Sequence, residues 1–366
     1  MSDDANQEGG DGFEALLEQV ARATHRTPAD PTDEPETPPT PGRGTVLEET
    51  YEIIDELSDA GGMGKVFVAR DLRLGRRVVV KMVRMRKFDD EHRILFEREA
   101  RATAQLNHRN IVTIHAFGFW DDVPYMVLEY LRGESLAERI DGAGVAEEPL
   151  VEMMVEVVRG LRHAHERGVF HRDIKPDNIF VTETGEVKLL DFGISMFDLD
   201  EETLRTALES GPDELLDTSP EMSGTPGFMA PEQWRGEAQD ARTDVWGIGA
   251  TLYVGLAGRY PYTPDRPVTL LMDGVDPLGD HAPTVASGTR ALVDRALGVD
   301  RQDRYADAEA LLEALDELRR RFQRDGELSG SPFRYLEPFG EQEEGWFFGR
   351  DAEVARLRRR VDANPL

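Results

Sequence analysis

The hydrophobic pattern of the chain alternates between strand-like and helix-like segments, beginning near residue 50. Short apolar runs, several of them rich in valine, occupy residues 51–57, 65–70, 77–83 and 125–131, and runs of this length and composition favour β-strands. Residues 94–106 instead repeat their apolar positions with the period of a helix. We therefore expect a small sheet accompanied by one helix in the first part of the folded chain.

A second long periodic segment lies towards the C-terminus, at residues 306–322. It is strongly helical with alternating charges, which predicts a helix that closes the second part of the fold. Residues 1–48 differ, because residues 28–41 alone include six prolines among Thr, Asp and Glu, a composition that cannot build a packed element. We interpret them as a disordered, extended arm. Residues 13–20 have helical apolar spacing, and both a transient helix and a docking peptide remain open.

Composition narrows the classes of function. A length of 366 residues suggests about two compact units plus tails. The net charge of −29 argues against nucleic acid and anionic membranes as partners, since both attract lysine and arginine. With no cysteine, disulfides, zinc–thiolate sites and thiol nucleophiles are excluded. The sequence shows neither a signal peptide nor a membrane-spanning run, and we expect a soluble, cytoplasmic protein.

The acidic excess is concentrated in two blocks. Residues 1–45 carry ten acidic side chains and three arginines, and residues 198–221 carry nine carboxylates and one arginine. With net charges of −7 and −8, the two blocks account for −15 of the total −29. The remaining chain is only moderately acidic, and we expect the chemistry there.

A glycine-rich segment, Gly61-Gly62-Met63-Gly64, separates the first two predicted strands. Glycines let a backbone lie over a phosphate chain, where its N–H groups are useful donors, although a plain hairpin turn would use the same residues. The next strand places Lys81 beside a run of valines, where an ammonium group needs a carboxylate or an anionic ligand. Glu99 follows on the predicted helix.

The most informative segment is His171-Arg172-Asp173-Ile174-Lys175-Pro176-Asp177-Asn178, followed by Asp191-Phe192-Gly193. With this ordered set the sequence resembles the eukaryotic-like serine/threonine protein kinases, and its Gly-Gly-Met-Gly loop is most similar to the bacterial members. The resemblance covers roughly residues 50–322. It implies an α+β, bilobal fold with a small antiparallel-sheet N-lobe, a mainly helical C-lobe and ATP between them. It also implies transfer of the ATP γ-phosphate, with Mg²⁺, to Ser/Thr hydroxyls of proteins.

The resemblance assigns roles to individual residues. Asp173 is expected to accept the proton of the substrate hydroxyl, and Lys175 to neutralise charge on the γ-phosphate. Asn178 and Asp191 are the expected Mg²⁺ ligands. Lys81 would bind the α- and β-phosphates, oriented by an ion pair with Glu99. The expected ATP-binding residues are Gly61, Gly62, Gly64, Val66, Val79, Lys81, Glu129 and Leu131.

Two positions depart from the family pattern. Asp59 replaces the first loop glycine, which places a carboxylate near the nucleotide and leaves its effect on ATP affinity open. Val79 stands where alanine is usual above the adenine, which should narrow that pocket. Neither change removes a catalytic group.

The segment from Asp191 to Glu232 is expected to control activity. The candidate phosphosites are Thr218, Ser219 and Ser223. Arg172, beside the catalytic Asp, could form an ion pair with a phosphate on this segment, and we therefore expect autophosphorylation. The alternative is a long loop without a regulatory role. The resemblance further implies that Thr225 hydrogen-bonds the catalytic Asp and Lys.

Two structural pairs are also implied by the resemblance. Glu232 is expected to form a buried bridge with Arg304, of structural rather than catalytic value. Asp244 is expected to brace the backbone of the catalytic loop from a helix.

An aromatic-rich segment follows the last predicted helix. Phe347-Phe348-Gly349-Arg350 resembles the entry of STAND-type P-loop ATPase modules, although no G-x-x-x-x-G-K-[ST] loop follows it in the 366 residues. We interpret the segment as the start of a longer kinase–ATPase protein. The alternative is that these aromatic side chains dock back on the kinase.

The expected organisation has three parts: an arm at residues 1–48, a kinase domain at 49–322 and a linker with the possible ATPase start at 323–366. Within the kinase domain, the N-lobe and hinge occupy 49–131 and the C-lobe 132–322, with the acidic insert at 198–221. One rival is a catalytically silent, nucleotide-binding scaffold that gates an ATPase or a partner. Another is an adaptor that acts through its proline-rich arm. The intact set of catalytic residues favours the enzyme.

Overall fold

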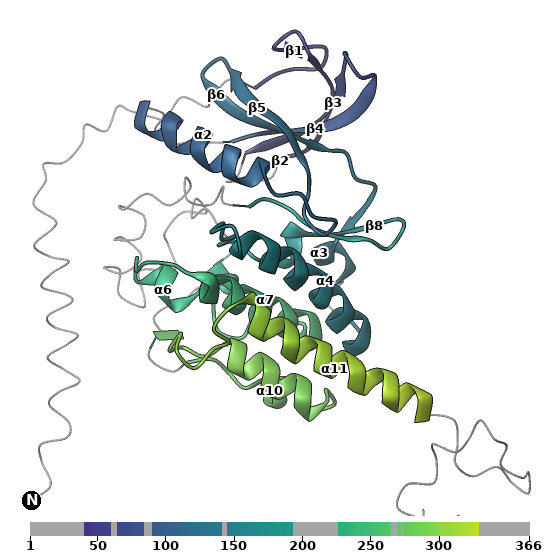
Figure 1. Cartoon of the computed structure of the whole chain (residues 1–366), viewed down its shortest axis with the longest axis vertical. Coiled ribbons are helices and arrows are strands. Elements are labelled where there is room, and N and C mark those ends of the chain that lie inside the picture. The colour runs from purple at the N-terminus through teal and green to yellow at the C-terminus, as the bar shows by residue number, and fades with distance from the viewer. Residues whose placement is uncertain are drawn as a thin grey trace, which may run out of the picture.

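The computed structural model describes residues 40–59, 64–83, 90–140, 145–192, 226–264, 270–271 and 274–328. These residues form two lobes, with the strands of a large sheet in the upper lobe and most helices in the lower one (Figure 1). We refer to them as the N-lobe and the C-lobe. The predicted α+β, bilobal architecture is confirmed.

The N-lobe is built on a six-stranded antiparallel sheet with the strand order β1-β2-β3-β4-β6-β5. Its strands are β1 (Val46–Leu47), β2 (Tyr51–Asp59), β3 (Lys65–Asp71), β4 (Arg76–Met82), β5 (Ile114–Trp120) and β6 (Val123–Glu129). Lys81 on β4 is paired with Val66 on β3 and with Met126 on β6. The lysine therefore lies in the middle of the three central strands.

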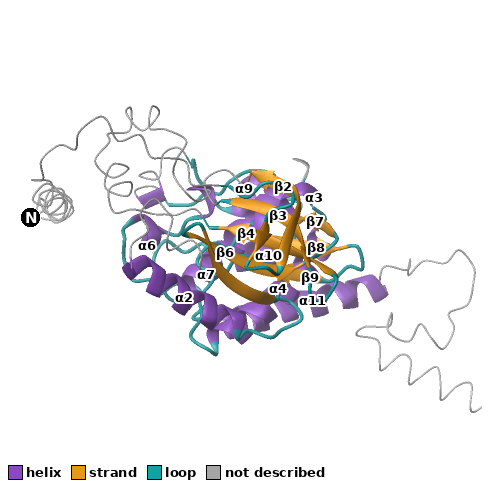
Figure 2. Ribbon diagram, turned by 90° about the horizontal axis from the view of Figure 1, so that it is seen from above, coloured by secondary structure: helices purple, strands orange, loops and turns teal. Residues whose placement is uncertain are grey.

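Strand β4 carries three consecutive valines because both of its faces are covered there. Val78 and Val80 are fully buried in a cluster on one face. On the other face, Val79 packs against a second cluster that includes Phe96 and Ala100 of helix α2 (Asp90–Ala104). Figure 2 shows this helix beside the sheet. A strand covered on both sides loses the alternating pattern and reads as a continuous apolar run.

The C-lobe surrounds one large apolar core. Its described helices are α3 (Leu136–Arg139), α4 (Glu147–His165), α6 (Pro231–Trp234), α7 (Ala241–Ala257), α9 (Leu278–His281), α10 (Ser287–Ala296) and α11 (Ala308–Leu328). Helix α11 packs against α4, and α10 packs against α7. Helix α7 is buried on nearly all sides, and its Trp246 and Tyr253 are fully buried. It begins at the N-cap Asp240 and ends at Gly258, whose φ of 66° suits the left-handed C-cap.

A second, three-stranded sheet belongs to the C-lobe and lies at its junction with the N-lobe (Figure 1). Its strands are β7 (Gly133–Ser135), β8 (Ile179–Thr182) and β9 (Val187–Leu189). A single turn of 3-10 helix, Pro176–Asn178, leads into β8. Residues 171–178, which carry the predicted catalytic motif, therefore lie between helix α4 and this sheet.

Two predicted boundaries differ from the structure. Residues 1–48 were predicted as a disordered arm, but β1 pairs with β2 inside that range and Leu47 is fully buried. The helix predicted at 306–322 begins at Ala308 and continues to Leu328. Most of the arm (1–39), the acidic insert (198–221) and the segment 329–366 lie outside the described residues.

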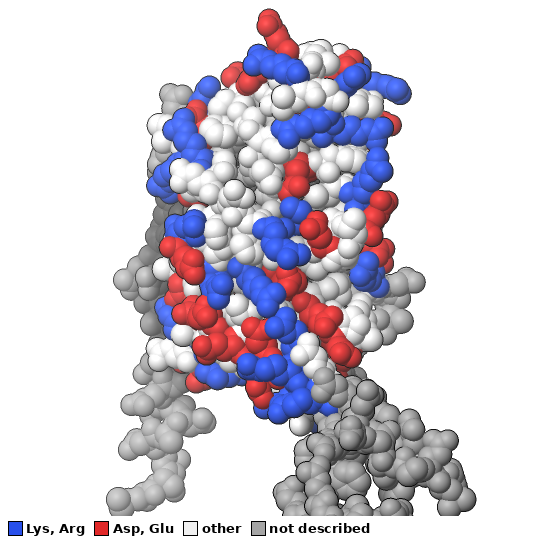
Figure 3. All heavy atoms as spheres, turned by 45° about the vertical axis from the view of Figure 1, so that its right-hand side comes forward, with Lys and Arg blue, Asp and Glu red and all other residues white. Residues whose placement is uncertain are grey.

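Within the described ranges, no helix combines the length and apolarity needed to cross a membrane. On the face drawn in Figure 3, acidic and basic side chains are interspersed over the C-lobe.

Candidate active site

A single buried carboxylate on helix α7 holds the 171–178 loop. Asp244 is 1% exposed and accepts hydrogen bonds from the backbone N–H groups of His171, at 2.9 Å, and Arg172, at 2.6 Å. Nε2 of His165 lies 2.7 Å from the same carboxylate. Burial alone would raise the pKa of Asp244, but His165 and the N–H donors lower it below the usual value. The predicted brace of the loop is confirmed.

Helix α7 can come this close because Gly247 faces the loop. A Cβ atom at this position would lie 2.7 Å from Cβ of Ile174. Arg172 has a φ of 67°, in the left-handed region, which costs a residue other than glycine about 1–3 kcal/mol. The bonds to Asp244 offset that strain, and Nε2 of Gln233 donates to the carbonyl of Arg172 at 2.8 Å. The loop is therefore held from two sides.

His171 connects the loop to the chain after β9. Its side chain is buried, with Nε2 2.6 Å from the carbonyl of Leu190 and Nδ1 3.3 Å from the backbone N of Asp173. A carbonyl only accepts and a backbone N–H only donates, so the two contacts select the neutral imidazole with its proton on Nε2. The ring also packs on Phe192, with 4.6 Å between centroids. Asp191 lies between these two partners in sequence and is thereby brought to the loop.

Asp173, Lys175 and Asn178 form a compact polar group. Nζ of Lys175 lies 3.0 Å from Oδ2 of Asp173, and Nδ2 of Asn178 donates to the same oxygen at 2.9 Å. Nδ2 of Asn178 also donates to the carbonyl of Asp173, at 2.8 Å. The Asp173 side chain remains 14% exposed, while that of Lys175 is 4% exposed. The carboxylate is thus oriented by a cation and an amide without being sealed from solvent.

Lys81 reaches from the N-lobe sheet to the segment after β9. Its Nζ lies 2.8 Å from Oδ2 of Asp191, and its side chain is only 4% exposed. Burial acts to raise the pKa of Asp191, but the ammonium group of Lys81, with a smaller contribution from Lys175, lowers it. Asp191 has a φ of 59°, a strained conformation for aspartate, as is common in functional sites. The ammonium group that the sequence placed in an apolar strand thus has a carboxylate partner.

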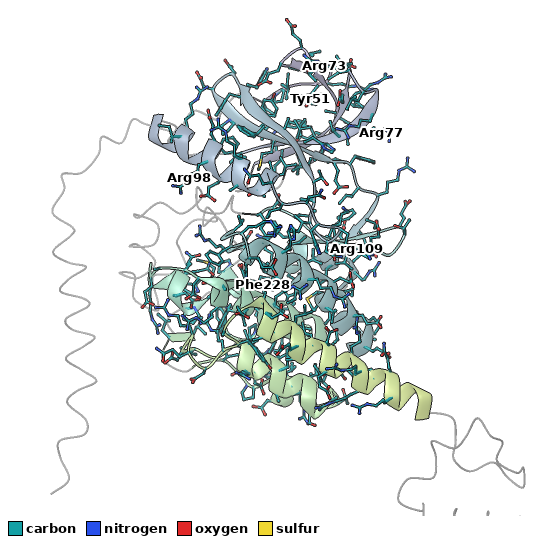
Figure 4. All side chains as sticks on the ribbon, viewed as in Figure 1. Tyr51, Arg73, Arg77, Arg98, Arg109 and Phe228 are labelled. Carbon is teal, nitrogen blue, oxygen red and sulfur yellow. The ribbon has the colours of Figure 1, made fainter. Side chains whose placement is uncertain are left out.

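Glu99 departs from its expected contact. Within the described ranges, Lys81 and Glu99 do not form an ion pair; Oε1 of Glu99 lies 3.2 Å from a guanidinium nitrogen of Arg98. Figure 4 labels Arg98 on helix α2. Asp191 already neutralises Lys81, and the adjacent arginine neutralises Glu99, so both ions have partners without the predicted pair.

The structure describes part of the predicted glycine-rich loop and of the predicted adenine-binding residues. Gly64 has a φ of 114°, which glycine tolerates far better than other residues, whereas Gly61 and Gly62 lie outside the described residues. Val66, Val79 and Leu131 are half-buried. Glu129 ends β6, and its carboxylate accepts from the backbone N–H of Thr113 and from Lys188, at 2.8 Å each.

The expected bridge between Glu232 and Arg304 is confirmed. Two guanidinium nitrogens lie 2.8 and 2.9 Å from the two carboxylate oxygens, and the side chains are 3% and 0% exposed. Thr243 Oγ1 also donates to Glu232, at 2.8 Å. Burial acts to raise the pKa of Glu232, but Arg304 holds it below the usual value. The bridge fixes the start of helix α6 against the core.

Six of the predicted site residues lie outside the residues that the structure describes. Those outside the described residues are Gly61, Gly62, Thr218, Ser219, Ser223 and Thr225. Arg172 is described, and its backbone is fixed by Asp244 and Gln233.

Residues 51–315 match the family model described as "Protein kinase domain". This range exceeds half of the chain. The chain belongs to the protein kinase domain family.

Curated relatives agree with this assignment. The chain is 35% identical over 271 residues to the probable serine/threonine-protein kinase PknB of Bifidobacterium longum, which covers 70% of this chain and 38% of that protein. It is 35% identical over 272 residues to the serine/threonine-protein kinase PknB of Mycobacterium tuberculosis, which covers 72% of this chain and 42% of that protein. The chain thus spans about two fifths of the length of these relatives.

A solved structure supports the fold. The crystal structure of the Mycobacterium tuberculosis PknI kinase domain aligns with a TM-score of 0.60 at 22% identity, covering 76% of this chain and 99% of that one. At this identity the likeness concerns the fold alone.

The donor set of the site fits a hard divalent cation such as Mg²⁺. Because Asn178 donates through Nδ2 to Asp173, its Oδ1 is the remaining end, and Oδ1 makes no hydrogen bond to any other described residue. Asp191 offers its second carboxylate oxygen. No described cluster of three or more His, Asp or Glu side chains forms a complete metal cage. Two protein oxygens completed by substrate phosphates and water are the usual arrangement for Mg²⁺.

Sequence reasoning missed His165 and Gln233. His165 contacts the buried Asp244, and Gln233 donates to the carbonyl of Arg172. Gln233 directly follows Ala230-Pro231-Glu232, and this adjacency to a motif was the only available signal. His165 lies at the end of a regular amphipathic helix, and the sequence pattern there gave no signal for its contact with Asp244.

Proposed function

We propose that this chain contains the catalytic domain of a serine/threonine protein kinase, which transfers the γ-phosphate of ATP to Ser/Thr hydroxyls of proteins. The observation that carries the proposal is the gathering of five motif residues from both lobes into two bonded groups. Lys81 and Asp191 form one group, and Asp173, Lys175 and Asn178 form the other. The names of the relatives, serine/threonine-protein kinases, support the substrate class.

In this mechanism Asp173 orients the substrate hydroxyl and accepts its proton. Its carboxylate is partly exposed and is held by Asn178 on one side and Lys175 on the other. Lys175, which contacts Asp173, would neutralise charge that develops on the transferred phosphoryl group. Positioning and charge neutralisation supply most of the catalysis in phosphoryl transfer, and both require a rigid loop. Asp244 provides that rigidity.

Asn178 and Asp191 would hold Mg²⁺, which when bound neutralises phosphate charge and bridges phosphate oxygens. Lys81 would bind the α- and β-phosphates, and Glu99 would replace Asp191 as its partner after a movement of helix α2. Gly61, Gly62, Gly64 and Val66 would cover the nucleotide, with Val79 beside the adenine. The backbone groups of Glu129 and Leu131 would hydrogen-bond the base.

Autophosphorylation of the segment after Asp191 completes the proposal. The candidate sites are Thr218, Ser219 and Ser223. A phosphate on this segment would pair with Arg172, next to the catalytic Asp173, and Thr225 would bond the catalytic Asp and Lys. Phosphopeptide mapping of active protein tests this part, and active protein without phosphate in residues 194–223 would refute it.

The main test is transfer of labelled phosphate from ATP to generic protein substrates and to the chain itself. Wild type should transfer phosphate in a Mg²⁺-dependent manner. Asp173→Asn should reduce the rate by about 10²–10⁴-fold, because it removes the proton acceptor while preserving shape. Equal inactivity of both proteins with several substrates would refute the proposal.

A catalytically silent, nucleotide-binding scaffold is the second candidate. One observation favours it: Glu99 pairs with Arg98 rather than with Lys81. In that case ATP would bind without phosphate transfer, and the protein would gate an ATPase or another partner.

The resemblance of Phe347-Phe348-Gly349-Arg350 to STAND-type ATPase modules is a separate part of the proposal. A phosphate-binding loop within about 50 further residues of the parent gene product would support it. A different domain in that place would refute it.

A further inference from the structure

The turn between β3 and β4 concentrates positive charge in an acidic chain. Residues 70–77 include four arginines and one aspartate, a net charge of +3, whereas the whole chain has a net charge of −29. Three of these arginines, Arg70, Arg73 and Arg77, form no ion pair with any residue that the structure describes. Figure 4 labels Arg73 and Arg77 in the upper lobe. We call residues 70–77 the basic tip.

The basic tip also exposes two leucines. Leu72 is 46% exposed and Leu74 is 67% exposed, which makes them two of the five exposed large apolar residues in the described part of the chain. Hydrogen bonds close the turn that carries them: Oδ1 of Asp71 accepts from the backbone N–H groups of Arg73 and Leu74, at 3.0 Å each. The N–H of Gly75 donates to the Asp71 carbonyl at 2.8 Å. The leucines are therefore held at the surface by a defined turn.

Residues 13–20 of the same chain have the complementary chemistry. Four apolar positions share one face at helical spacing: Phe13, Leu16, Leu17 and Val20. On a helix, Glu14 and Glu18 would lie together on one flank of that face, and the segment contains no basic residue. A second copy of the chain would present the same arginines to the basic tip, whereas this segment presents the opposite charge.

The N-terminal arm leaves the fold beside the basic tip. Leu47 of β1 is fully buried and pairs with Tyr51, which in turn pairs with Asp71 at the end of β3. Two strand spacings, about 10 Å, therefore separate β1 from the tip. The N–H of Leu72 also donates to the carbonyl of Thr50 at 2.9 Å. The point where the arm begins is thus fixed next to this surface.

The chain between the two segments is long enough for them to meet. Twenty positions separate Val20 from Thr40, where the described chain begins. A coil of this length has an end-to-end distance of about 25 Å, which exceeds the separation between β1 and the basic tip. Such a connection gives an effective concentration of about 1 mM, so even a contact with a Kd of about 0.1 mM between separate molecules would be occupied about 90% of the time.

We propose that residues 13–20 dock on the basic tip of the same chain, with their apolar face on Leu72 and Leu74 and with Glu14 and Glu18 paired to the arginines. Docking removes the two leucines from water and gives the arginines acidic partners. The inference goes beyond the proposed function, because it requires neither ATP nor phosphate transfer.

The test is photo-cross-linking in the full chain, with Phe13 replaced by p-benzoylphenylalanine, which keeps an aromatic ring at that position. Mass spectrometry should locate the cross-links in residues 70–77, in chains that migrate as monomers under denaturing conditions. Leu72→Ser combined with Leu74→Ser should lower the yield about tenfold. Each lost leucine contact weakens docking about tenfold, so the occupied fraction falls from about 90% to about 10%.

Matched controls exist on both sides of the contact. Leu57 of β2 is a 53% exposed leucine on the same sheet, and Leu57→Ser should leave the yield unchanged. In the arm, Glu14→Lys with Glu18→Lys should lower the yield about twofold, the effect of a roughly tenfold weaker contact. Asp33→Lys with Glu36→Lys changes the net charge equally, outside the docking segment, and should leave the yield unchanged.

The outcomes separate this inference from its alternatives. Cross-links that join two chains would assign the basic tip to a second copy and would overturn the proposal. Cross-links scattered over both lobes, or equal yields in the Leu72→Ser/Leu74→Ser and Leu57→Ser variants, would overturn it as well. A wild type that transfers no phosphate would refute the proposed function and leave this inference intact, because the cross-linking readout is independent of catalysis.

Discussion

Replacing Asp244 with asparagine tests how the catalytic loop is held. The carboxylate receives two backbone N–H groups, from His171 and Arg172, and it contacts His165. An asparagine keeps the shape but presents one acceptor oxygen and one NH₂ group. In either orientation of the amide, the NH₂ group faces at least one backbone N–H that donated to the wild-type carboxylate.

The expected loss of stability follows from these contacts. At least one charge-assisted hydrogen bond is lost, worth about 1.5–3 kcal/mol, and one buried donor is left unpaired, at a further cost of about 1–3 kcal/mol. We therefore expect Asp244→Asn to lower the free energy of unfolding by about 3–5 kcal/mol, measured by urea denaturation with circular dichroism. Arg172 would lose part of the support for its left-handed conformation, so kcat should fall at least about tenfold.

Asp240→Asn is the matched control on the same helix. Asp240 is the N-cap of α7, its side chain is 38% exposed, and asparagine caps helices about as well as aspartate. This variant should cost less than about 1 kcal/mol, with kcat unchanged. If Asp244→Asn also stays within about 1 kcal/mol of wild type and retains its kcat, the carboxylate does not hold the loop and the reasoning fails.

Three further predictions concern the core and the site. Arg304→Met leaves the buried carboxylate of Glu232 without its cation and should lower the free energy of unfolding in urea by about 3–5 kcal/mol. A loss below about 1 kcal/mol would contradict the buried bridge. Gly247→Ala forces a methyl group against Ile174 and should cost about 1–3 kcal/mol and lower kcat; an unchanged kcat would show that the loop adapts. The folded-state pKa values of Asp191 and Glu232 are lowered, so their contribution to stability is present above the unfolded-state pKa of about 4 and lost as pH falls below it. Urea midpoints should therefore fall steeply between about pH 5 and pH 3, and a flat profile would contradict this.

The bilobal architecture was predicted from the resemblance to a known family, whereas regular apolar spacing predicted only individual elements. The valine-rich strands, the single N-lobe helix and the closing helix all follow from apolar spacing, and the catalytic loop follows from one dense motif. The N-terminal boundary was misplaced because β1 is only two residues long, too short for any periodic signal. Its buried Leu47 is a single apolar residue within a polar stretch.

The sequence predicted which residues form the site better than it predicted the contacts between them. Which carboxylate neutralises Lys81 depends on the position of helix α2, and no residue pattern encodes that position; the structure pairs Lys81 with Asp191 instead of Glu99. His165 and Gln233 were missed for a related reason. Each is one polar residue whose partner is chosen by the packing of distant elements.

For the proposed nucleotide site, the ion pair between Lys81 and Asp191 would make ATP binding an exchange of ionic partners rather than a simple addition. In the proposed function, Lys81 would exchange its carboxylate partner for phosphates, and Asp191 would exchange an ammonium partner for a cation. Each group stays neutralised before and after the exchange, so the buried site never has to hold a bare charge at rest. Affinity would then report the difference between two sets of ionic partners, and a change that weakens the resting pair without altering Lys81 or Asp191 should tighten nucleotide binding.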